Sequence, residues 1–162
     1  MGINCINGIS AMENEQEVEW FWQNRIPKKA ISMLAALGGQ GKSGLALWLC
    51  LEFGCKLGKK CMYVDTEQTF IHLSSRLRQW QHPSTENLII PVEEDDSGLV
   101  ESACPSIENI AKWATEYECE FVVIDSLTTL GARYDLNKRN EAAIVFKELR
   151  SIAVKANAAL MV

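Results

Sequence analysis

The residues best suited to chemistry lie in segment 36–43, which reads Ala-Leu-Gly-Gly-Gln-Gly-Lys-Ser. This segment fits the phosphate-binding loop pattern, with Ala36 where the stricter pattern has glycine. Glycines lack a Cβ atom, so the backbone can approach phosphate groups and direct successive N–H groups at them. Lys42 would reach the terminal phosphates, and the Ser43 hydroxyl would be a ligand of Mg²⁺. The candidate nucleotide-binding residues are Gly38, Gly39, Gln40, Gly41, Lys42, Ser43 and Gly44.

The flanks of this loop agree with a site for a nucleoside triphosphate. Residues 30–34 are mostly apolar and predict a short buried strand, and the apolar run 45–51 predicts a helix. Strand, loop and helix in this order are the context that the motif requires. The helix would begin near Lys42 and add the partial positive charge of its N-terminus. The alternative is a glycine-rich start of a helix with a coincidental Lys-Ser pair.

A second candidate is Asp125, which directly follows the apolar run Phe-Val-Val-Ile at 121–124. A carboxylate at the end of such a strand can hold Mg²⁺ or one of its waters opposite Ser43. Ser43 and Asp125 are therefore the candidate metal ligands. The alternative is an ordinary aspartate in a turn at the end of a strand.

Glu67 is the candidate base for activating water, and Glu67 and Lys42 are the candidate catalytic residues. Hydrolysis needs a carboxylate near the γ-phosphate that is oriented toward a water molecule. No glutamate directly follows Asp125, whereas Glu67 follows another apolar strand, 60–65. The alternative is a glutamate that interacts with the positive end of the helix dipole.

These residues are positioned by strands that alternate with helices along the chain. The predicted strands are continuous apolar runs, which indicate a parallel sheet with helices on both faces, a three-layer α/β fold. Ligands bind such sheets at the carboxyl ends of the strands. Three polar clusters would meet there: the phosphate loop, Asp65-Thr66-Glu67 and Asp125-Ser126. Further strands are expected at 88–92, 121–126 and 158–162, and helices at 42–57, 70–80, 107–117 and 141–156. We expect residues 1–17 to be a loose leader and residues 18–162 to form one domain.

Composition restricts the partners. The net charge of −5 provides no global basic field for nucleic acid. No apolar run is long enough to span a membrane, and no secretory signal is visible, so we expect a cytoplasmic protein. The six cysteines lack C-x₂-C spacing and predict reduced thiols, mostly in the core.

Two other segments have alternative interpretations. The aromatic segment 18–22 is expected to pack against the sheet edge, with base stacking as the alternative. The acidic segment 93–98 is expected to be a solvated turn, with a metal site as the alternative.

Several of these segments together resemble RecA-like P-loop ATPases of the AAA type. They are Arg-Ile-Pro at 25–27, the phosphate loop, Tyr-Val-Asp-Thr-Glu at 63–67 and Val-Ile-Asp-Ser at 123–126. The closest likeness is to the RepA/DnaB-type hexameric helicases of plasmids and phages, over residues 18–162. The resemblance implies hydrolysis of ATP with Mg²⁺ by the motor core of a DNA helicase, DNA as a partner, and a hexameric ring of identical chains.

The resemblance also implies roles for single residues. In this family the acid after the second strand is the catalytic glutamate, which supports Glu67. An arginine in the following helix often lies near the nucleotide, which points to Arg76. Arg133, Asn140 and Glu141 match the loop after the second motif, although solvated charges explain them equally well.

In this family the last strand seen here leads into a residue that senses the γ-phosphate, and a further strand and an arginine finger follow. We therefore expect a core that is incomplete at its C-terminus and hydrolyses ATP weakly. The final segment would lie in the middle of the sheet. The strand before the phosphate loop would then lack a neighbour on its other side, and an open strand edge favours aggregation.

Two other function classes remain open. In the first, ATP would drive oligomerisation or partner binding without a motor, and stimulation of turnover by DNA would separate this switch from a helicase. The second is a small-molecule kinase, which usually has an arginine-rich lid, but the region 83–105 is acidic.

Overall fold

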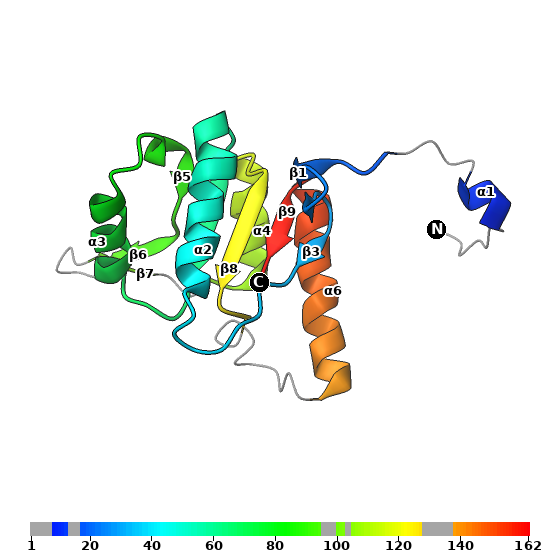
Figure 1. The fold of residues 1–162 in the computed structure, drawn as a ribbon. Helices are drawn as coiled ribbons and strands as arrows, with labels where there is room; N and C mark the ends of the chain where they lie inside the picture. The colour runs from blue at the N-terminus through cyan, green and yellow to red at the C-terminus, as the bar shows by residue number, and fades with distance from the viewer. Residues whose placement is uncertain (1–7, 13–16, 95–99, 103–104, 128–137) are drawn as a thin grey trace.

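A five-stranded sheet forms the centre of the chain in the computed structural model, which describes residues 8–12, 17–94, 100–102, 105–127 and 138–162. The strand order is β3-β9-β8-β4-β5, and all neighbours are parallel (Figure 1). Their bounds are β3 Ile31–Ser32, β9 Ala159–Met161, β8 Phe121–Asp125, β4 Cys61–Asp65 and β5 Leu88–Ile89. The predicted parallel α/β sheet is confirmed, and the final segment lies between β3 and β8 as expected.

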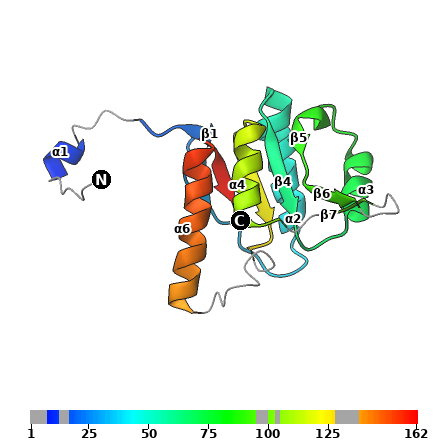
Figure 2. The same ribbon diagram turned by 180° about the vertical axis from the view of Figure 1, so that it is seen from behind.

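Helices cover both faces of this sheet. On one face lies α2 (Lys42–Leu49), and on the other lie α4 (Ile107–Glu116) and α6 (Arg139–Lys155); the latter two come to the front in Figure 2. The helix α3 (Phe70–Trp80) contributes Leu73 to the core on the α2 side. Ser106 caps α4, because its hydroxyl accepts a hydrogen bond from the Asn109 N–H at 3.1 Å. The structure therefore has the three predicted layers.

The alternation of side chains along the central strands explains their continuous apolar sequences. In β4, Tyr63 packs in the core beneath α2, whereas Met62 and Val64 pack with α4 and α6. All five residues of β4 and all five of β8 are buried. A strand covered on both faces needs apolar residues at nearly every position.

The strand predicted at residues 30–34 is present as β3, but it is not buried as predicted. β3 is half-buried, and the Met33 side chain that follows it is 62% exposed. Within the described sheet β3 is an edge strand, because it pairs with β9 on one side and with no strand on the other. Pairing nevertheless continues past β3, since the Leu34 N–H donates to the Val162 carbonyl at 2.8 Å.

The helix predicted at 42–57 changes its geometry along its length. α2 passes into a π-helical turn at Cys50–Gly54 and a 3₁₀ turn at Cys55–Leu57. Gly58 ends it with a φ of 74°, as expected for a glycine stop. Gly54 lies against β4, where a Cβ atom would be 2.0 Å from the Cys61 sulfur.

Replacing Gly54 by Ala is expected to lower the free energy of unfolding by about 1–3 kcal/mol, because the added methyl group overpacks the core. Urea unfolding followed by circular dichroism measures this loss. Gly44→Ala is the matched control: nothing lies within 4 Å of its added Cβ. Helix propensity alone should make that control more stable by about 0.5–1 kcal/mol. Equal stability of the two variants would contradict the close approach of Gly54 to Cys61.

The aromatic segment before the sheet packs on the core, but not at the sheet edge where it was expected. β1 (Trp20–Trp22) pairs with β2 (Ile26–Pro27) in an antiparallel hairpin. Phe21 is 4% exposed and stacks on Phe121 with ring centroids 4.3 Å apart. The contact is therefore with the start of the central strand β8 rather than with the sheet edge. The short helix α1 (Gly8–Met12) lies apart from the sheet (Figure 1).

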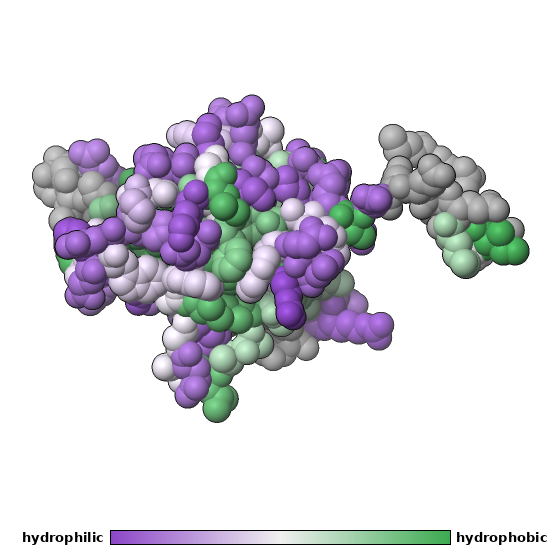
Figure 3. All heavy atoms as spheres, turned by 45° about the horizontal axis from the view of Figure 1, so that its top comes forward, coloured by the Kyte–Doolittle hydropathy of each residue, from purple (hydrophilic) through white to green (hydrophobic). Residues whose placement is uncertain are grey.

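A second aromatic cluster lies partly at the surface over the π-helical turn. Phe53 stacks on Trp22 at 4.1 Å between ring centroids and meets the Trp48 edge at 5.5 Å. Trp48, Leu45 and Leu57 are exposed along α2 and the turns that follow it. Apolar surface is visible among polar side chains on this side of the molecule in Figure 3.

The strand predicted at 88–92 forms two short strands instead of one. The first two residues of the predicted acidic turn, 93–94, belong to the second of these strands. β5 stops at Ile89, and β6 (Val92–Glu94) pairs antiparallel with β7 (Val100–Ser102). Pro91 lies between β5 and β6 and cannot donate to a strand ladder. Glu93 and Glu94 are exposed as expected, but they belong to the strand β6 rather than to a turn. Residues 95–98 of the predicted turn lie outside the described part of the chain.

The predicted core thiols are confirmed for four cysteines. Cys50, Cys55, Cys61 and Cys119 are free and buried, and burial raises the pKa of Cys119 to about 12. Cys5 and Cys104 lie outside the described residues.

Candidate nucleotide-binding site

The glycine-rich loop connects β3 to α2 and leaves space over its backbone. Gly39 and Gly41 have φ values of 73° and 80°, a region that favours glycine. Nothing lies within 4 Å of a Cβ atom added at Gly38, Gly39, Gly41 or Gly44. Gly41 is the N-cap of α2 and has no side chain with which to cap the helix. The first N–H groups of α2 are thus presented to the open loop, a suitable arrangement for an anion.

Lys42 folds its side chain back across this loop. Its Nζ donates to the carbonyl oxygens of Ala36 at 2.8 Å and Leu37 at 3.2 Å. The ammonium group is therefore held next to the backbone that would cradle a phosphate. It has three donors, so it can bind an anion while it keeps part of this contact.

Asp125 and Ser43 converge through the hydroxyl of Tyr63. This hydroxyl donates to Asp125 Oδ2 at 2.6 Å and lies 3.3 Å from the Ser43 carbonyl oxygen. Asp125 is only 9% exposed at the end of β8. Burial, and then the charge of Asp125, raises the pKa of Tyr63, so the hydroxyl remains a donor. The Asp125 carboxylate therefore lies close to the backbone of Ser43, the other candidate metal ligand.

Glu67 is brought to the same edge by ties between the ends of β4 and β8. Asp65 is in register with Asp125, and the Thr66 N–H donates to the Asp125 carbonyl at 2.8 Å. The Thr66 hydroxyl accepts from the Ser126 N–H at 2.9 Å and donates to the Ser126 carbonyl at 3.1 Å. The Ser126 hydroxyl in turn donates to Glu67 Oε1, and the Asp125–Ser126 peptide bond is cis. The proposed base is thus held beside the Asp125–Ser126 pair.

Asp65 shapes the turn that presents Glu67. The carboxylate is 3% exposed, and its Oδ1 accepts from the N–H groups of Glu67 at 3.1 Å and Gln68 at 2.8 Å. Burial raises the pKa of Asp65, although these two N–H donors oppose the effect. The role of Asp65 is therefore to fix the backbone between β4 and α3.

Arg76 contacts the same turn. Its Nη2 donates to Gln68 Oε1 at 3.3 Å, and its Nη1 is buried without a hydrogen-bond partner among the described residues. A buried guanidinium nitrogen without a partner is costly. The structure thus places Arg76 beside the turn that carries Glu67, with one donor still to be satisfied.

Arg133, Asn140 and Glu141 match the family's loop after the second motif, and the structure describes two of them. Arg133 lies outside the described residues. Asn140 is exposed near the start of α6, and Glu141 forms an ion pair with Lys138 at 3.3 Å.

Sequence reasoning missed Tyr63 as part of the site, and it placed Thr66 and Ser126 at the strand ends without giving them a role. A sequence signal existed for Tyr63, which is a hydroxyl-bearing residue two positions before Asp65 in an otherwise apolar strand. Since side chains two apart share one face of a strand, its hydroxyl could be expected near the polar end. The hydrogen bonds of Thr66 with Ser126, and of Ser126 with Glu67, were not predicted.

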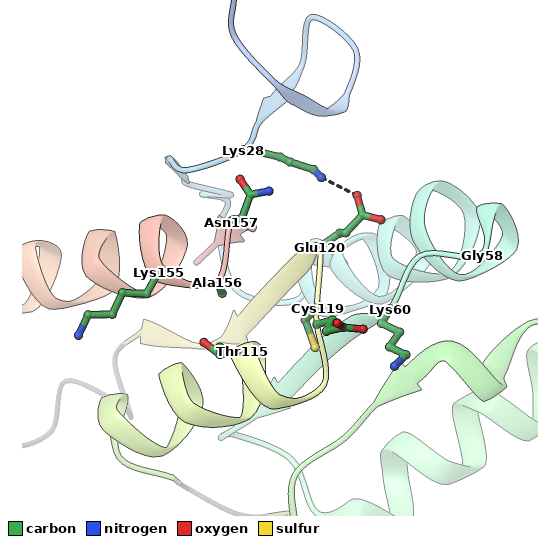
Figure 4. A pocket seen from close by; sticks show the side chains of 10 residues that line it. Lys28, Gly58, Lys60, Thr115, Cys119, Glu120, Lys155, Ala156 and Asn157 are labelled. Carbon is green, nitrogen blue, oxygen red and sulfur yellow. Dashed lines mark ion pairs between the residues drawn. The ribbon is translucent and has the colours of Figure 1, made fainter.

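A pocket of about 520 Å³ lies at the opposite, amino-terminal edge of the sheet (Figure 4). It is lined by residues that precede the strands, among them Lys28, Lys60, Glu120 and Asn157. Lys28 and Glu120 pair with each other there at 2.6 Å. This pocket is separate from the phosphate loop and shares none of the candidate site residues.

The parallel sheet, the loop between β3 and α2, and the acidic residues at the neighbouring strand ends define a RecA-like P-loop ATPase fold. The family model described as AAA domain (AAA_25) matches residues 8–162, and the chain belongs to this family. A solved KaiC-like protein from the hyperthermophilic archaeon Pyrococcus horikoshii OT3 has the same fold, with a TM-score of 0.60 and 15% sequence identity. The match covers 84% of this chain and 63% of that protein's length. No match was found among curated protein sequences.

Among the described residues, no helix has the length and apolar character needed to cross a membrane.

Proposed function

We propose that this domain binds ATP with Mg²⁺ and hydrolyses it. The observation that supports the proposal is an arrangement at one edge of the sheet: Lys42 lies over the open glycine loop, the Ser43 backbone begins α2, and the Asp125 and Glu67 carboxylates lie at two neighbouring strand ends. The contacts of the Tyr63 hydroxyl with Ser43 and Asp125, and of the Ser126 hydroxyl with Glu67, join segments far apart in the sequence.

The loop and Lys42 would bind the phosphates. Phosphate oxygens would replace water as the partners of the backbone N–H groups at the start of α2. They would also replace the loop's own carbonyls as partners of the Lys42 ammonium. Ser43 and Asp125 would hold Mg²⁺, because a hydroxyl and a carboxylate are the oxygen ligands that this ion prefers. The Arg76 Nη1 has no hydrogen-bond partner among the described residues, and we propose that it donates to the bound nucleotide.

Glu67 would accept the proton of the water that attacks the γ-phosphate. The Ser126 hydroxyl holds Glu67 at the edge of the sheet, which orients the carboxylate. When bound, Mg²⁺ would neutralise the negative charge that develops on the phosphate oxygens.

At the finer level we propose that the domain is the motor core of a RecA-like ATPase that acts on DNA as a homo-oligomeric ring. The support is the sequence resemblance to hexameric helicases over residues 18–162.

A second candidate is an ATP-dependent switch that controls oligomerisation or partner binding. The net charge of −5 favours it, because a DNA motor needs basic surface to contact the phosphate backbone.

The rate of phosphate release with and without single-stranded DNA tests these two candidates. A motor predicts a rate that rises when DNA is added at low salt and loses this rise at high salt. A rate of phosphate release that is the same with and without DNA at every salt concentration contradicts the motor and favours the switch.

A further inference from the structure

Tyr63 is a buried residue whose aromatic ring and hydroxyl have different surroundings. The residue has no exposed surface, and its ring belongs to the core cluster beneath α2 with Leu47, Cys50 and Val123. Its hydroxyl points toward the polar ends of the strands, as shown by its two oxygen contacts there. Because packing fixes the ring, the position of the hydroxyl is fixed as well.

Those two contacts join separate elements. The shorter one, 2.6 Å to Asp125 Oδ2, connects β4 to the end of β8. The longer one, 3.3 Å to the Ser43 carbonyl, reaches the first turn of α2. A tyrosine hydroxyl has one proton, and a bond to a carboxylate is stronger than one to a neutral carbonyl, so the proton is directed at Asp125.

We propose that Tyr63 is a positioning residue for the Mg²⁺ site, which fixes the Asp125 carboxylate relative to Ser43 before metal and nucleotide bind. The inference rests on the proposed function and deepens it. The terminal torsion of an aspartate is soft, so without a partner its carboxylate samples a broad range of orientations. Removing such an outer partner of a metal ligand typically lowers metal affinity or activity about 10–100-fold.

Tyr63→Phe tests this role, because it removes the hydroxyl and keeps the ring. The measured quantity is the Mg²⁺-dependent gain in ATP affinity, taken as the ratio of ATP dissociation constants in EDTA and in excess Mg²⁺ by titration calorimetry. We expect this gain to fall about tenfold or more. The affinity in EDTA should be unchanged, because Lys42 and the glycine loop bind the phosphates without Tyr63.

Two controls separate positioning from stability. Tyr117→Phe makes the same change at an exposed residue after α4 and should leave the Mg²⁺-dependent gain at the wild-type value. Leu149→Ala creates a cavity in the core cluster on the other face of the sheet, which does not include the Tyr63 ring. It should lower the thermal unfolding temperature without reducing the Mg²⁺-dependent gain.

Three results would overturn the proposal. The first is a wild-type Mg²⁺-dependent gain in Tyr63→Phe, and the second is an equal loss of ATP affinity in EDTA and in Mg²⁺, which would mark a structural role. The third, a wild-type chain that does not bind ATP in either condition, would refute the proposed function as well. If Tyr63→Phe does not fold, Tyr63→Met takes its place, since the flexible apolar side chain of methionine adapts to gaps.

Discussion

Replacing Glu67 by Gln is expected to preserve ATP binding and to slow hydrolysis about 10²–10⁴-fold. The amide has nearly the same shape as the carboxylate and can still accept the Ser126 hydroxyl, but it cannot take a proton from water. Single-turnover release of phosphate, with the protein in excess over labelled ATP, measures this rate even when turnover is slow. Calorimetry on the same variant reports whether ATP binding is retained.

Glu108→Gln is the matched control for this substitution. Glu108 lies in the first turn of α4, so it interacts with a helix N-terminus but lies on another helix from Glu67. Its replacement should leave hydrolysis unchanged. A wild-type rate in Glu67→Gln would show that another group is the base, and loss of ATP binding would assign Glu67 to the binding of nucleotide instead.

Replacing Lys42 by Ala is expected to raise the dissociation constant for ATP about 10–100-fold. A hydrogen bond to a charged group contributes about 1.5–3 kcal/mol, and about 1.4 kcal/mol corresponds to a factor of ten. The substitution also removes the two contacts that hold the ammonium on the loop carbonyls of Ala36 and Leu37. Fluorescence titration with a labelled ATP analogue measures the change.

Lys56→Ala controls for the loss of one positive charge. Lys56 is exposed and pairs with Glu52 one turn away, a surface contact that contributes little. Its removal should leave ATP affinity at the wild-type value. Equal affinities of Lys42→Ala and wild type would contradict the assignment of residues 36–43 as a phosphate loop.

The sequence predicted the central sheet and the meeting of the candidate residues because both depend on patterns that lie within single segments. The runs ending at Asp65 and Asp125 are apolar throughout, and parallel strands bring their carboxyl ends to one edge. The ties made by Thr66 and Ser126 depend on the register between β4 and β8, in which Asp65 faces Asp125. Register is a property of two segments together, and the pattern within either segment does not determine it.

The errors have a similar origin. The run 30–34 is apolar, but apolarity does not reveal whether a strand is central or at an edge, so the exposure of Met33 was not predicted. Glu93 and Glu94 have the composition of a solvated turn, yet they lie in a strand because β7 pairs with them from farther along the chain. In both cases a partner in space outweighed the local pattern.

Titration calorimetry of the purified chain with MgATP directly tests whether the strand-end cluster is an ATP site. Circular dichroism and thermal unfolding on the same sample first establish that the protein is folded. We expect saturable binding of one ATP per chain, which EDTA weakens because Ser43 and Asp125 then lose the Mg²⁺ that they share with the phosphates. A folded chain that shows no ATP binding, with or without Mg²⁺, would refute the proposed ATP site.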